Sequence, residues 1–327
     1  MRPHRYLSAL IAAGAAITVA TGSSAQAAPI GAQAVNPVLA SPYLYFGWGS
    51  PPSPTTVMAA ANVKAFTLAF MLSNGGCTPA WDGSRALNGT DATRISQIRS
   101  AGGDVIVSFG GWSGNKLGER CTSASALANA YQQVINAYRL TAIDIDIENT
   151  EMGSDAAQDR VLGALKIIKQ NNPSVKTVIT MGTATNGPES RGQRLITRAQ
   201  QLGANVDVWT IMPFDFTSGG QNMATLTQSA SEGLKNRLKA AFGWSDDTAY
   251  RRMGISSMNG RTDTGETVTL ANFNTILSYA QQHHLARFTY WSTNRDRPCG
   301  SGTSADACSG ISQASWDFSK VIGRYNG

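Results

Sequence analysis

The chain is poor in charge, histidine and cysteine, and each shortage excludes a class of function. Only 15% of its 327 residues are charged, and the basic residues behind the formal net charge of +6 are scattered. Nucleic acids and anionic lipid surfaces are bound by runs of Lys and Arg, so we expect neither as a partner. His4, His283 and His284 have no spacing that suits metal ligation or acid–base chemistry. We expect no metal and no cofactor.

Long apolar runs are also absent, apart from one near the start. Arg2 and Arg5 precede an apolar stretch from Leu7 to Val19, and Ala25-Gln26-Ala27 forms an A-x-A cleavage site. This pattern is typical of a secretory signal peptide, which we assign to residues 1–27. A membrane anchor is the alternative, but the stretch is too short to cross a bilayer. We expect a soluble protein, secreted to the extracellular space.

The four cysteines are Cys77, Cys121, Cys299 and Cys308. They contain no C-x-x-C spacing of the kind that binds zinc. An even number of cysteines in an exported chain indicates disulfides, although the count leaves their connectivity open.

Strand-like runs alternate with helix-like segments over most of the chain. The strand-like runs are Tyr43–Trp48, Ala65–Leu72, Asp104–Phe109, Ala142–Glu148, Thr177–Met181, Val206–Pro213, Arg252–Ser257 and Ala286–Trp291. The helix-like segments include Asp91–Ala101, Ala124–Tyr138, Gln158–Asn171, Gly192–Leu202, Met223–Ala241 and Leu270–His284. Such alternation implies parallel pairing with right-handed crossovers, and eight units predict an α/β fold of the closed (β/α)8 TIM-barrel type. An open doubly wound sheet is the alternative, but no Gly-rich phosphate loop follows the first run.

The domain organisation follows from composition. Residues 28–41 form a short N-terminal tail rich in Ala and Pro, and residues 42–327 form the barrel. No Gly/Ser-rich linker separates a further module, so we expect one catalytic domain.

The segment 140–148 alternates strictly between apolar and acidic residues. Its isoleucines are Ile143, Ile145 and Ile147, and its acids are Asp144, Asp146 and Glu148. On a strand the two sets point to opposite faces, so three carboxyls share one face. Inside a barrel they are costly unless hydrogen-bonded, protonated or metal-bound, which indicates a functional site. A divalent-cation site is the alternative, but ligands on one straight strand splay over ~13 Å, too far for one ion.

Four sequence blocks carry a family resemblance. They are Ser108-Phe109-Gly110-Gly111, the D-x-D-x-E of residues 144–148, Met212-Pro213-Phe214-Asp215, and Trp291 with Asn294-Arg295-Asp296-Arg297. In this order they resemble the glycoside hydrolase family 18 chitinases, and together they span most of the mature chain. The resemblance implies a secreted, endo-acting chitinase that cleaves β-1,4 N-acetylglucosamine linkages with retention.

The resemblance also implies a mechanism in which the substrate supplies the nucleophile. Glu148 would act as general acid and then as base, Asp146 would orient the 2-acetamido group, and Asp144 would share a proton with Asp146. Stacked carboxyls in a closed site cannot all ionise cheaply, which agrees with proton sharing.

The implied substrate-binding residues are Ser108, Gly110, Gly111, Met212, Phe214, Asp215 and Trp291. Trp291 would form a floor under the sugar, since an indole stacks well on a pyranose face. Core packing is the alternative for Met212, Phe214 and Trp291. We expect Trp48, Trp81 and Trp112 near the mouth loops, where they would floor further subsites.

Two positions depart from the family pattern. Thr141 stands where the family usually has an Asp, and Phe214 lies in a block that often contains a Tyr. We expect altered support hydrogen bonds at Thr141 and a weaker cyclisation step at Phe214, with Asp215 still able to orient the acetamido group. We interpret the 294–296 run as loop-ordering.

The barrel interpretation also favours one disulfide connectivity, Cys77–Cys121 and Cys299–Cys308, because it places each pair in neighbouring loops. The gap between the last two strand-like runs is filled by the 270–284 helix and its turns, so the α+β insertion domain of many family members has no room. We therefore expect an open groove, internal cleavage of chitin or chito-oligosaccharides, and a monomer. An endo-β-N-acetylglucosaminidase acting on N-glycan cores and a non-hydrolytic chitin-binding lectin are the alternatives, and an intact Glu148 argues against the lectin.

Overall fold

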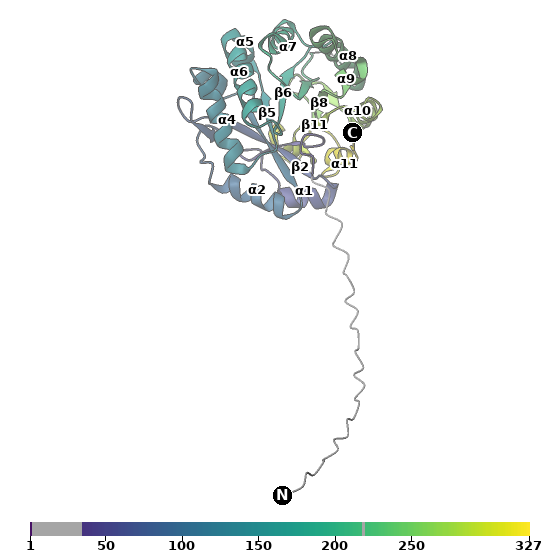
Figure 1. Cartoon of the computed structure of the whole chain (residues 1–327). Helices are drawn as coiled ribbons and strands as arrows, with labels where there is room; N and C mark the ends of the chain where they lie inside the picture. The colour runs from purple at the N-terminus through teal and green to yellow at the C-terminus, as the bar shows by residue number, and fades with distance from the viewer. Residues whose placement is uncertain (2–34, 218–219) are drawn as a thin grey trace. The chain divides into compact units, whose positions relative to one another are not determined.

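Eight parallel strands pair in the order in which the chain makes them, and helices surround them (Figure 1). The structure, a computed structural model, describes Met1, residues 35–217 and residues 220–327, so the predicted signal peptide lies outside the described residues. The strands are β1 (Tyr43–Tyr45), β2 (Ala65–Ser73), β4 (Asp104–Gly110), β5 (Ala142–Asp146), β6 (Lys176–Gly182), β7 (Val208–Met212), β8 (Met253–Met258) and β11 (Arg287–Trp291). This is the predicted (β/α)8 barrel.

The barrel is closed by contacts between its last strand and the residues before β1. The Phe288 amide donates to the Leu39 carbonyl oxygen at 2.9 Å, and Thr289 Oγ1 donates to the Ser41 carbonyl oxygen at 2.5 Å. Val38 is 5% exposed. The second half of the segment assigned to the tail is thus packed against the barrel.

The helices match the predicted segments and add several that the sequence did not indicate. The longer ones are α1 (Pro54–Ala61), α2 (Thr90–Ser100), α4 (Ala124–Tyr138), α6 (Asp155–Asn171), α7 (Ser190–Leu202), α8 (Met223–Phe242) and α10 (Leu270–Gln282). The short ones are α3 (Leu117–Arg120), α5 (Asn149–Gly153), α9 (Asp246–Tyr250) and α11 (Asp317–Ile322), with 3₁₀ turns at Thr293–Arg295 and Ala305–Ala307. The short helices were missed because they lack a full amphipathic period.

Local chemistry explains where the longer helices begin and end. Ser123 caps α4 by accepting the Ala126 amide at 3.1 Å, and Thr269 and Asn272 form a reciprocal capping box at the start of α10. Gly203 and Gly243 end α7 and α8 in the left-handed conformation that glycine adopts without strain.

Side chains inside the barrel form an apolar layer below a polar one. The apolar layer consists of Val38, Ile106, Ala142, Val178 and Val208. Two residues further along β4 and β5 the same inward face carries Ser108 and Asp144, since side chains alternate along a strand. The intervening residues on the outward face, such as Val107 and Ile143, pack into the main hydrophobic cluster beneath the helices. The lower apolar layer closes the barrel floor and leaves the polar groups at the other end.

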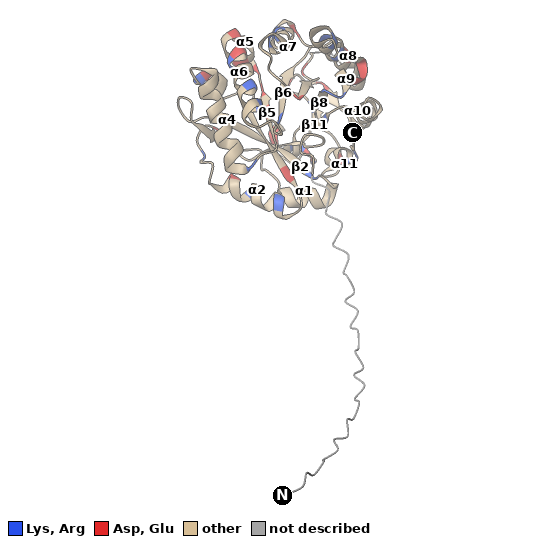
Figure 2. Cartoon of the chain, in the orientation of Figure 1, with Lys and Arg blue, Asp and Glu red and all other residues tan. Residues whose placement is uncertain are grey.

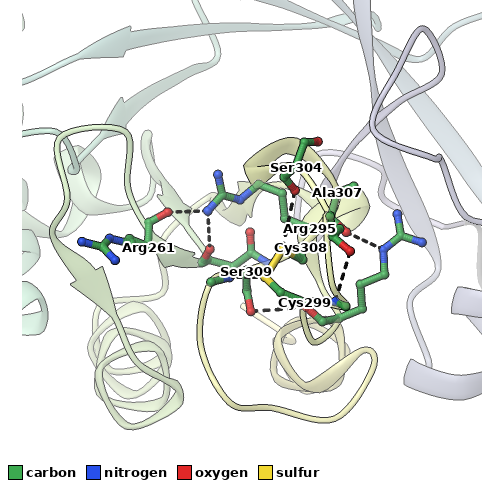
Figure 3. The surroundings of a disulfide bond; sticks show 12 residues. Arg261, Arg295, Cys299, Ser304, Ala307, Cys308 and Ser309 are labelled. Carbon is green, nitrogen blue, oxygen red and sulfur yellow. Dashed lines mark hydrogen bonds between the residues drawn. A yellow bond between two sulfur atoms is a disulfide. The ribbon is translucent and has the colours of Figure 1, made fainter.

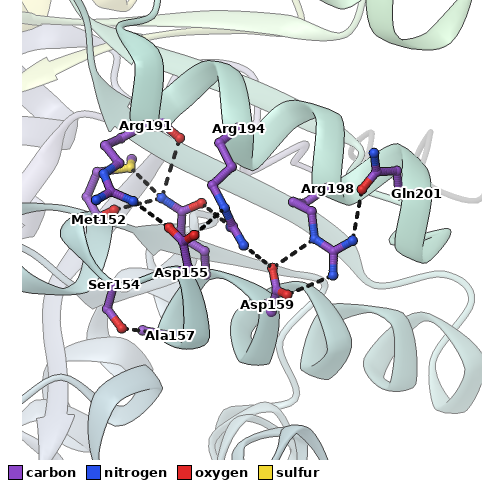
Figure 4. Close-up of polar contacts among 10 residues, drawn as sticks. Met152, Ser154, Asp155, Ala157, Asp159, Arg191, Arg194, Arg198 and Gln201 are labelled. Atoms are coloured by element: carbon purple, nitrogen blue, oxygen red, sulfur yellow. Dashed lines mark hydrogen bonds and ion pairs between the residues drawn. The ribbon is translucent and has the colours of Figure 1, made fainter.

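Charged side chains are scattered over the outer helices, as Figure 2 shows. The densest group joins α6 to α7 (Figure 4), where Asp155 pairs with Arg191 and with Arg194 at 3.1 Å. Asp159 pairs with Arg194 at 3.0 Å and with Arg198 at 2.7 Å. Partly exposed pairs add little stability each, so this network mainly fixes how the two helices align.

The structure contains the two expected disulfides. Cys77, in the turn between β2 and β3 (Pro79–Trp81), is bonded to Cys121 at the end of α3. Cys299 is bonded to Cys308 in the loop after β11 (Figure 3), beside the buried side chain of Arg295. Each bridge therefore fixes a loop at the carboxyl end of the strands.

The chain between β8 and β11 is short. It forms a hairpin of β9 (Gly260–Arg261) and β10 (Thr267–Val268), followed by α10. No insertion domain interrupts residues 259–286, all of which the structure describes. Among the described residues, no helix is both long and apolar enough to cross a membrane.

The two disulfides should contribute unequally to stability. Cys77–Cys121 spans 44 residues and Cys299–Cys308 spans 9, so loop-closure entropy predicts losses of about 4 kcal/mol and about 2.6 kcal/mol when each pair is replaced by alanine. Urea unfolding of the two double variants checks the order. Non-reducing peptide mapping that links Cys77 to Cys299 or Cys308 would refute the pairing.

Candidate active site

Asp144 lies fully buried inside the barrel, with three hydroxyl groups around it. Tyr43 Oη donates to its Oδ2 at 2.7 Å, Ser108 Oγ donates to the same oxygen at 2.6 Å, and Thr180 Oγ1 donates to Oδ1 at 2.7 Å. These donors come from β1, β4 and β6, so they surround Asp144 only in the assembled barrel. Hydrogen bonds of this kind fix the orientation of the side chain.

Asp146 ends β5, two residues beyond Asp144 and on the same face of the strand. Its side chain is 3% exposed, and its Oδ1 has no hydrogen-bond partner among the described residues. Gly110 has a φ of 105°, and a Cβ there would collide with the Asp146 carbonyl oxygen, while the Gly111 amide donates to that oxygen at 2.8 Å. The predicted close backbone approach beside the acids is thus present, and only glycine fits it.

Glu148 follows the strand and begins the turn into α5. Its backbone is extended, with φ −134° and ψ 171°, and Asn149 then adopts a left-handed φ of 47°. Asn tolerates this conformation better than most residues, because its short polar side chain bonds locally. The sharp reversal comes just after Glu148, which leaves Glu148 above Asp144 and Asp146 at the carboxyl end of the barrel, where TIM-barrel active sites lie.

Burial and like charges shift both upper acids toward the protonated form. Burial, then the charges of Glu148 and Asp144, raise the pKa of Asp146 well above its usual range. Burial also raises the pKa of Glu148 to about 7, against the ammonium of Lys116, with smaller contributions from Asp215 and Asp263. A carboxyl with a pKa near neutrality suits general acid catalysis.

Asp215 lies just beyond β7 and is held by the hairpin after β8. Its φ is 58°, and its Oδ1 accepts the Thr264 amide at 3.0 Å and Thr264 Oγ1 at 3.3 Å. The charge of Asp215 raises the pKa of Glu148. The connection after β7 therefore brings Asp215 close to the acids of β5. Met212, 8% exposed, ends β7, and Phe214 packs partly buried against the main hydrophobic cluster.

An aromatic cluster occupies the mouth beside β1 and β11. Trp291 stacks on Phe70 with ring centroids 5.7 Å apart and an interplanar angle of 13°. Tyr43 and Tyr45 approach Trp291 at 5.9 and 6.4 Å, and Trp48 meets it edge-on at 6.3 Å. Trp291 remains partly exposed, so one part of its ring is packed and the rest is open to a ligand.

The other tryptophans do not all reach the surface. Trp48 and Trp112 are 45% and 66% exposed. The expectation for Trp81 is wrong, because its side chain is completely buried and its Nε1 donates to Tyr138 Oη at 2.8 Å. Trp81 lies on the short strand β3, which pairs antiparallel with β2. The sequence alone did not reveal this pairing.

The 294–296 run orders loops, as expected. Asn294 accepts the Tyr45 amide at 3.0 Å and donates to the Tyr45 and Trp48 carbonyl oxygens at 2.8 and 3.1 Å. Asp296 accepts the Ser319 amide and hydroxyl, both at 2.7 Å. Thr141 lies exposed at the start of β5, away from the acids.

Several residues of the site were not identified from the sequence. They are Tyr43, Phe70, Lys116, Glu151, Thr180 and Asp263. Glu151 is 2% exposed in α5, and burial, then the charge of Glu119, raises its pKa to about 8. Lys116 is only 2% exposed. Lysines are rarely buried, so this burial indicates a functional role, but the sequence alone does not reveal it. The sequence contexts of these residues carry no signal: all but Glu151 come from other strands or loops than the acids, and the burial of Glu151 is decided by packing.

No family model matches the chain. Two curated proteins are similar to it in sequence. A probable bifunctional chitinase/lysozyme of Escherichia coli K12 is 27% identical over 284 residues, covering 81% of this chain and 32% of the relative. Endochitinase 11 of Metarhizium anisopliae is 26% identical over 273 residues, covering 79% of this chain and 52% of the relative. The chain therefore spans about a third and about half of these relatives.

Solved structures agree. The catalytic domain of a hyperthermophilic chitinase from Pyrococcus furiosus superposes with a TM-score of 0.79 at 27% identity, covering 88% of this chain and 96% of that one. The chain is similar to chitinases in both sequence and fold. Active domain 2 of the Pyrococcus enzyme, studied as catalytic-site mutants with chito-oligosaccharides, gives a TM-score of 0.80. A GH18 chitinase of Chromobacterium violaceum, 16% identical with a TM-score of 0.57, shares the fold.

Glu151 should make the stability of the protein fall as the pH rises. Its folded pKa of about 8 lies above the usual value, so between the two the folded state keeps a proton that the unfolded state has released. The free energy of unfolding should therefore decline with increasing pH through this window. Glu151→Gln should flatten the decline, although Asp146 keeps part of it.

Urea unfolding from pH 5 to pH 9 measures the slope, and the exposed Glu189→Gln is the matched control. An E151Q slope equal to that of the wild type would contradict this assignment.

Proposed function

We propose that the chain is a secreted chitinase that hydrolyses β-1,4 N-acetylglucosamine linkages with retention, by substrate-assisted catalysis. The observation that carries the proposal is the graded column of Asp144, Asp146 and Glu148. The deepest carboxylate is fixed by three hydroxyls, the middle one is buried with a raised pKa, and the outer one has a pKa of about 7. The similarity to chitinases supports the substrate.

Each residue has a defined task in the proposed reaction. Glu148 protonates the glycosidic oxygen as the 2-acetamido carbonyl oxygen attacks the anomeric carbon, so the leaving sugar departs and an oxazolinium ion forms. Asp144 takes the proton that it shares with Asp146, so Asp146 accepts the acetamido N–H and its negative charge offsets the positive charge of the oxazolinium ring. Glu148 then removes a proton from water, which attacks the anomeric carbon and regenerates the acetamido group. Attack on alternate faces gives overall retention.

The aromatic and polar residues at the mouth complete this proposal. Trp291 would support the sugar at the scissile bond through its partly exposed ring. Asp215, oriented by Thr264, would hold the acetamido group, with Met212 and Phe214 beside it. Because Phe214 has no hydroxyl, Asp215 is the group from this block that can bond the acetamido group.

Internal cleavage is the second part of the proposal. Only the β9–β10 hairpin and α10 lie between β8 and β11, so no extra domain forms a wall there. A polymer could then enter the groove at any point along its length. The scattered charge supports a neutral polysaccharide as partner, and we propose that the protein acts as a monomer without a cofactor.

Secretion is proposed from two observations. Two disulfides form readily in an oxidising compartment, and residues 1–27 have the pattern of an export signal. An N-glycan endoglycosidase would use the same acids, so a reducing-end assay on colloidal chitin beside a high-mannose glycoprotein separates the two.

Replacing the general acid should abolish turnover without affecting the fold. Glu148→Gln keeps the shape of the side chain but cannot donate a proton at neutral pH, so the rate on unactivated chitin oligomers should fall by about 10²–10⁴-fold. Oligosaccharide binding, measured by calorimetry, should persist. Glu189→Gln makes the same chemical change on the surface and should leave the rate unchanged; a near-normal rate for E148Q would overturn the assignment.

Soluble chitin derivatives should lose viscosity while reducing ends are still few. Internal cuts shorten the chains quickly, whereas cuts from one end hardly change the average length at first. The two quantities are followed in the same digest, with E148Q as the inactive blank. If the first products of a long oligomer are almost entirely disaccharide from one end, the groove is closed and the inference from the short β8–β11 connection fails.

A further inference from the structure

Lys116 is a buried lysine to which the proposed mechanism gives no task. It is 2% exposed in the loop between β4 and α3, and its Nζ donates to the Trp112 carbonyl oxygen at 2.8 Å. An ammonium is expensive to bury unless opposite charge lies nearby. Such a residue therefore points to a negatively charged neighbour.

The loop that carries Lys116 is fixed at both ends. The Ser73 amide of β2 donates to the Asn115 carbonyl oxygen at 2.8 Å, and Cys121 is bonded to Cys77. The Lys116 carbonyl oxygen accepts the Glu119 amide at 3.2 Å at the start of α3. The ammonium is therefore held at one place relative to the barrel.

That place is next to the turn of the general acid. The Trp112 carbonyl oxygen that binds Lys116 Nζ also accepts Asn149 Nδ2 at 3.3 Å. Asn149 immediately follows Glu148 and has the left-handed backbone that orients it. The Trp112 carbonyl oxygen thus accepts hydrogen bonds both from the ammonium of Lys116 and from the turn that positions Glu148.

A second carboxyl of the same turn is also buried. Glu151 is 2% exposed, and its Oε2 has no hydrogen-bond partner among the described residues. The Gly118 amide, in the helix that follows Lys116, bonds the Glu151 carboxyl, and the Lys116 charge lowers the pKa of both Glu151 and Glu148. One ammonium therefore acts on two carboxyls from the adjacent β5–α6 connection.

We propose that Lys116 is a positioning residue whose buried ammonium is the shared counter-ion of Glu148 and Glu151, and that this charge sets how far into the alkaline range the enzyme works. The proposal rests on the proposed role of Glu148 as general acid. It adds a group that touches no substrate and acts through the acid.

The other charged groups around the two carboxyls are mostly acidic. The charges of Asp215 and Asp263, from the connections after β7 and β8, raise the pKa of Glu148, and the charge of Glu148 raises that of Asp146 of β5. Glu119 acts on Glu151, as does Arg160 of α6, whose Nη1 also donates to the Gly118 carbonyl oxygen. Of these groups, Lys116 is the cation that acts on Glu148.

Lys116→Met tests the proposal, because it keeps an unbranched side chain only one atom shorter and removes the charge. Without the ammonium, Glu148 should stay protonated to higher pH, so the alkaline limb of the kcat/KM profile on chito-oligosaccharides should move up by on the order of one pH unit. Lys116→Arg keeps the charge and should retain the wild-type limb. A purely structural lysine would lower kcat/KM without moving the limb, and an unmoved limb in K116M overturns the proposal.

A titration independent of turnover separates this proposal from the proposed function. The chain has six glutamates, so carboxyl ¹³C signals of labelled full-length protein can be assigned with E148Q and E151Q. The Glu148 signal should titrate at higher pH in K116M than in the wild type, even if the protein proves inactive on chitin.

If K116M does not fold, the wild type still decides the question. The Lys116 Cε signal, assigned with K116R, should shift as Glu148 titrates, and E148Q should remove that inflection. A Lys116 signal that is insensitive to both carboxyls refutes the shared counter-ion.

Discussion

The buried Asp144 carboxylate and its three hydroxyl donors determine the rest of the site. Tyr43, Ser108 and Thr180 come from three different strands, and each donates to one of its oxygens. A charge in this position is tolerable only when these bonds are made. The barrel must therefore close correctly before Asp144 has an acceptable environment, which couples the fold to the site.

Burial and neighbouring charges raise the pKa of both acids above Asp144. Asp146 lies next on the same face and cannot ionise cheaply beside it, while Glu148 stands outside the strand, where a pKa of about 7 results. Arg287 lowers the pKa of Asp146 from within the barrel; its Nη2 donates to Thr67 Oγ1 at 2.6 Å. Within the described residues no group of three or more His, Cys, Asp or Glu is arranged to hold a metal ion.

The loops around the acids are fixed more firmly than loops usually are. The Cys77–Cys121 bridge anchors the connection that carries Lys116, and Asn294 bonds the backbone at Tyr45 and Trp48. Thr264 holds Asp215 from the opposite side. General acid catalysis depends on the placement of a proton donor to within a fraction of an ångström. This rigidity around Glu148 agrees with that requirement.

The sequence alone determined the barrel, the acidic strand and the glycines beside it, because their signals are local. Alternation fixes which side chains of β5 face inward, and the eight repeated units fix closure. Even so, β1 and β5 end at Tyr45 and Asp146, before the predicted ends, because the chain turns there. Only the tertiary structure decided the burial of Trp81 and Glu151 and brought Lys116 and Phe70 to the site. These features depend on contacts between distant segments, for which a single sequence carries no periodic signal.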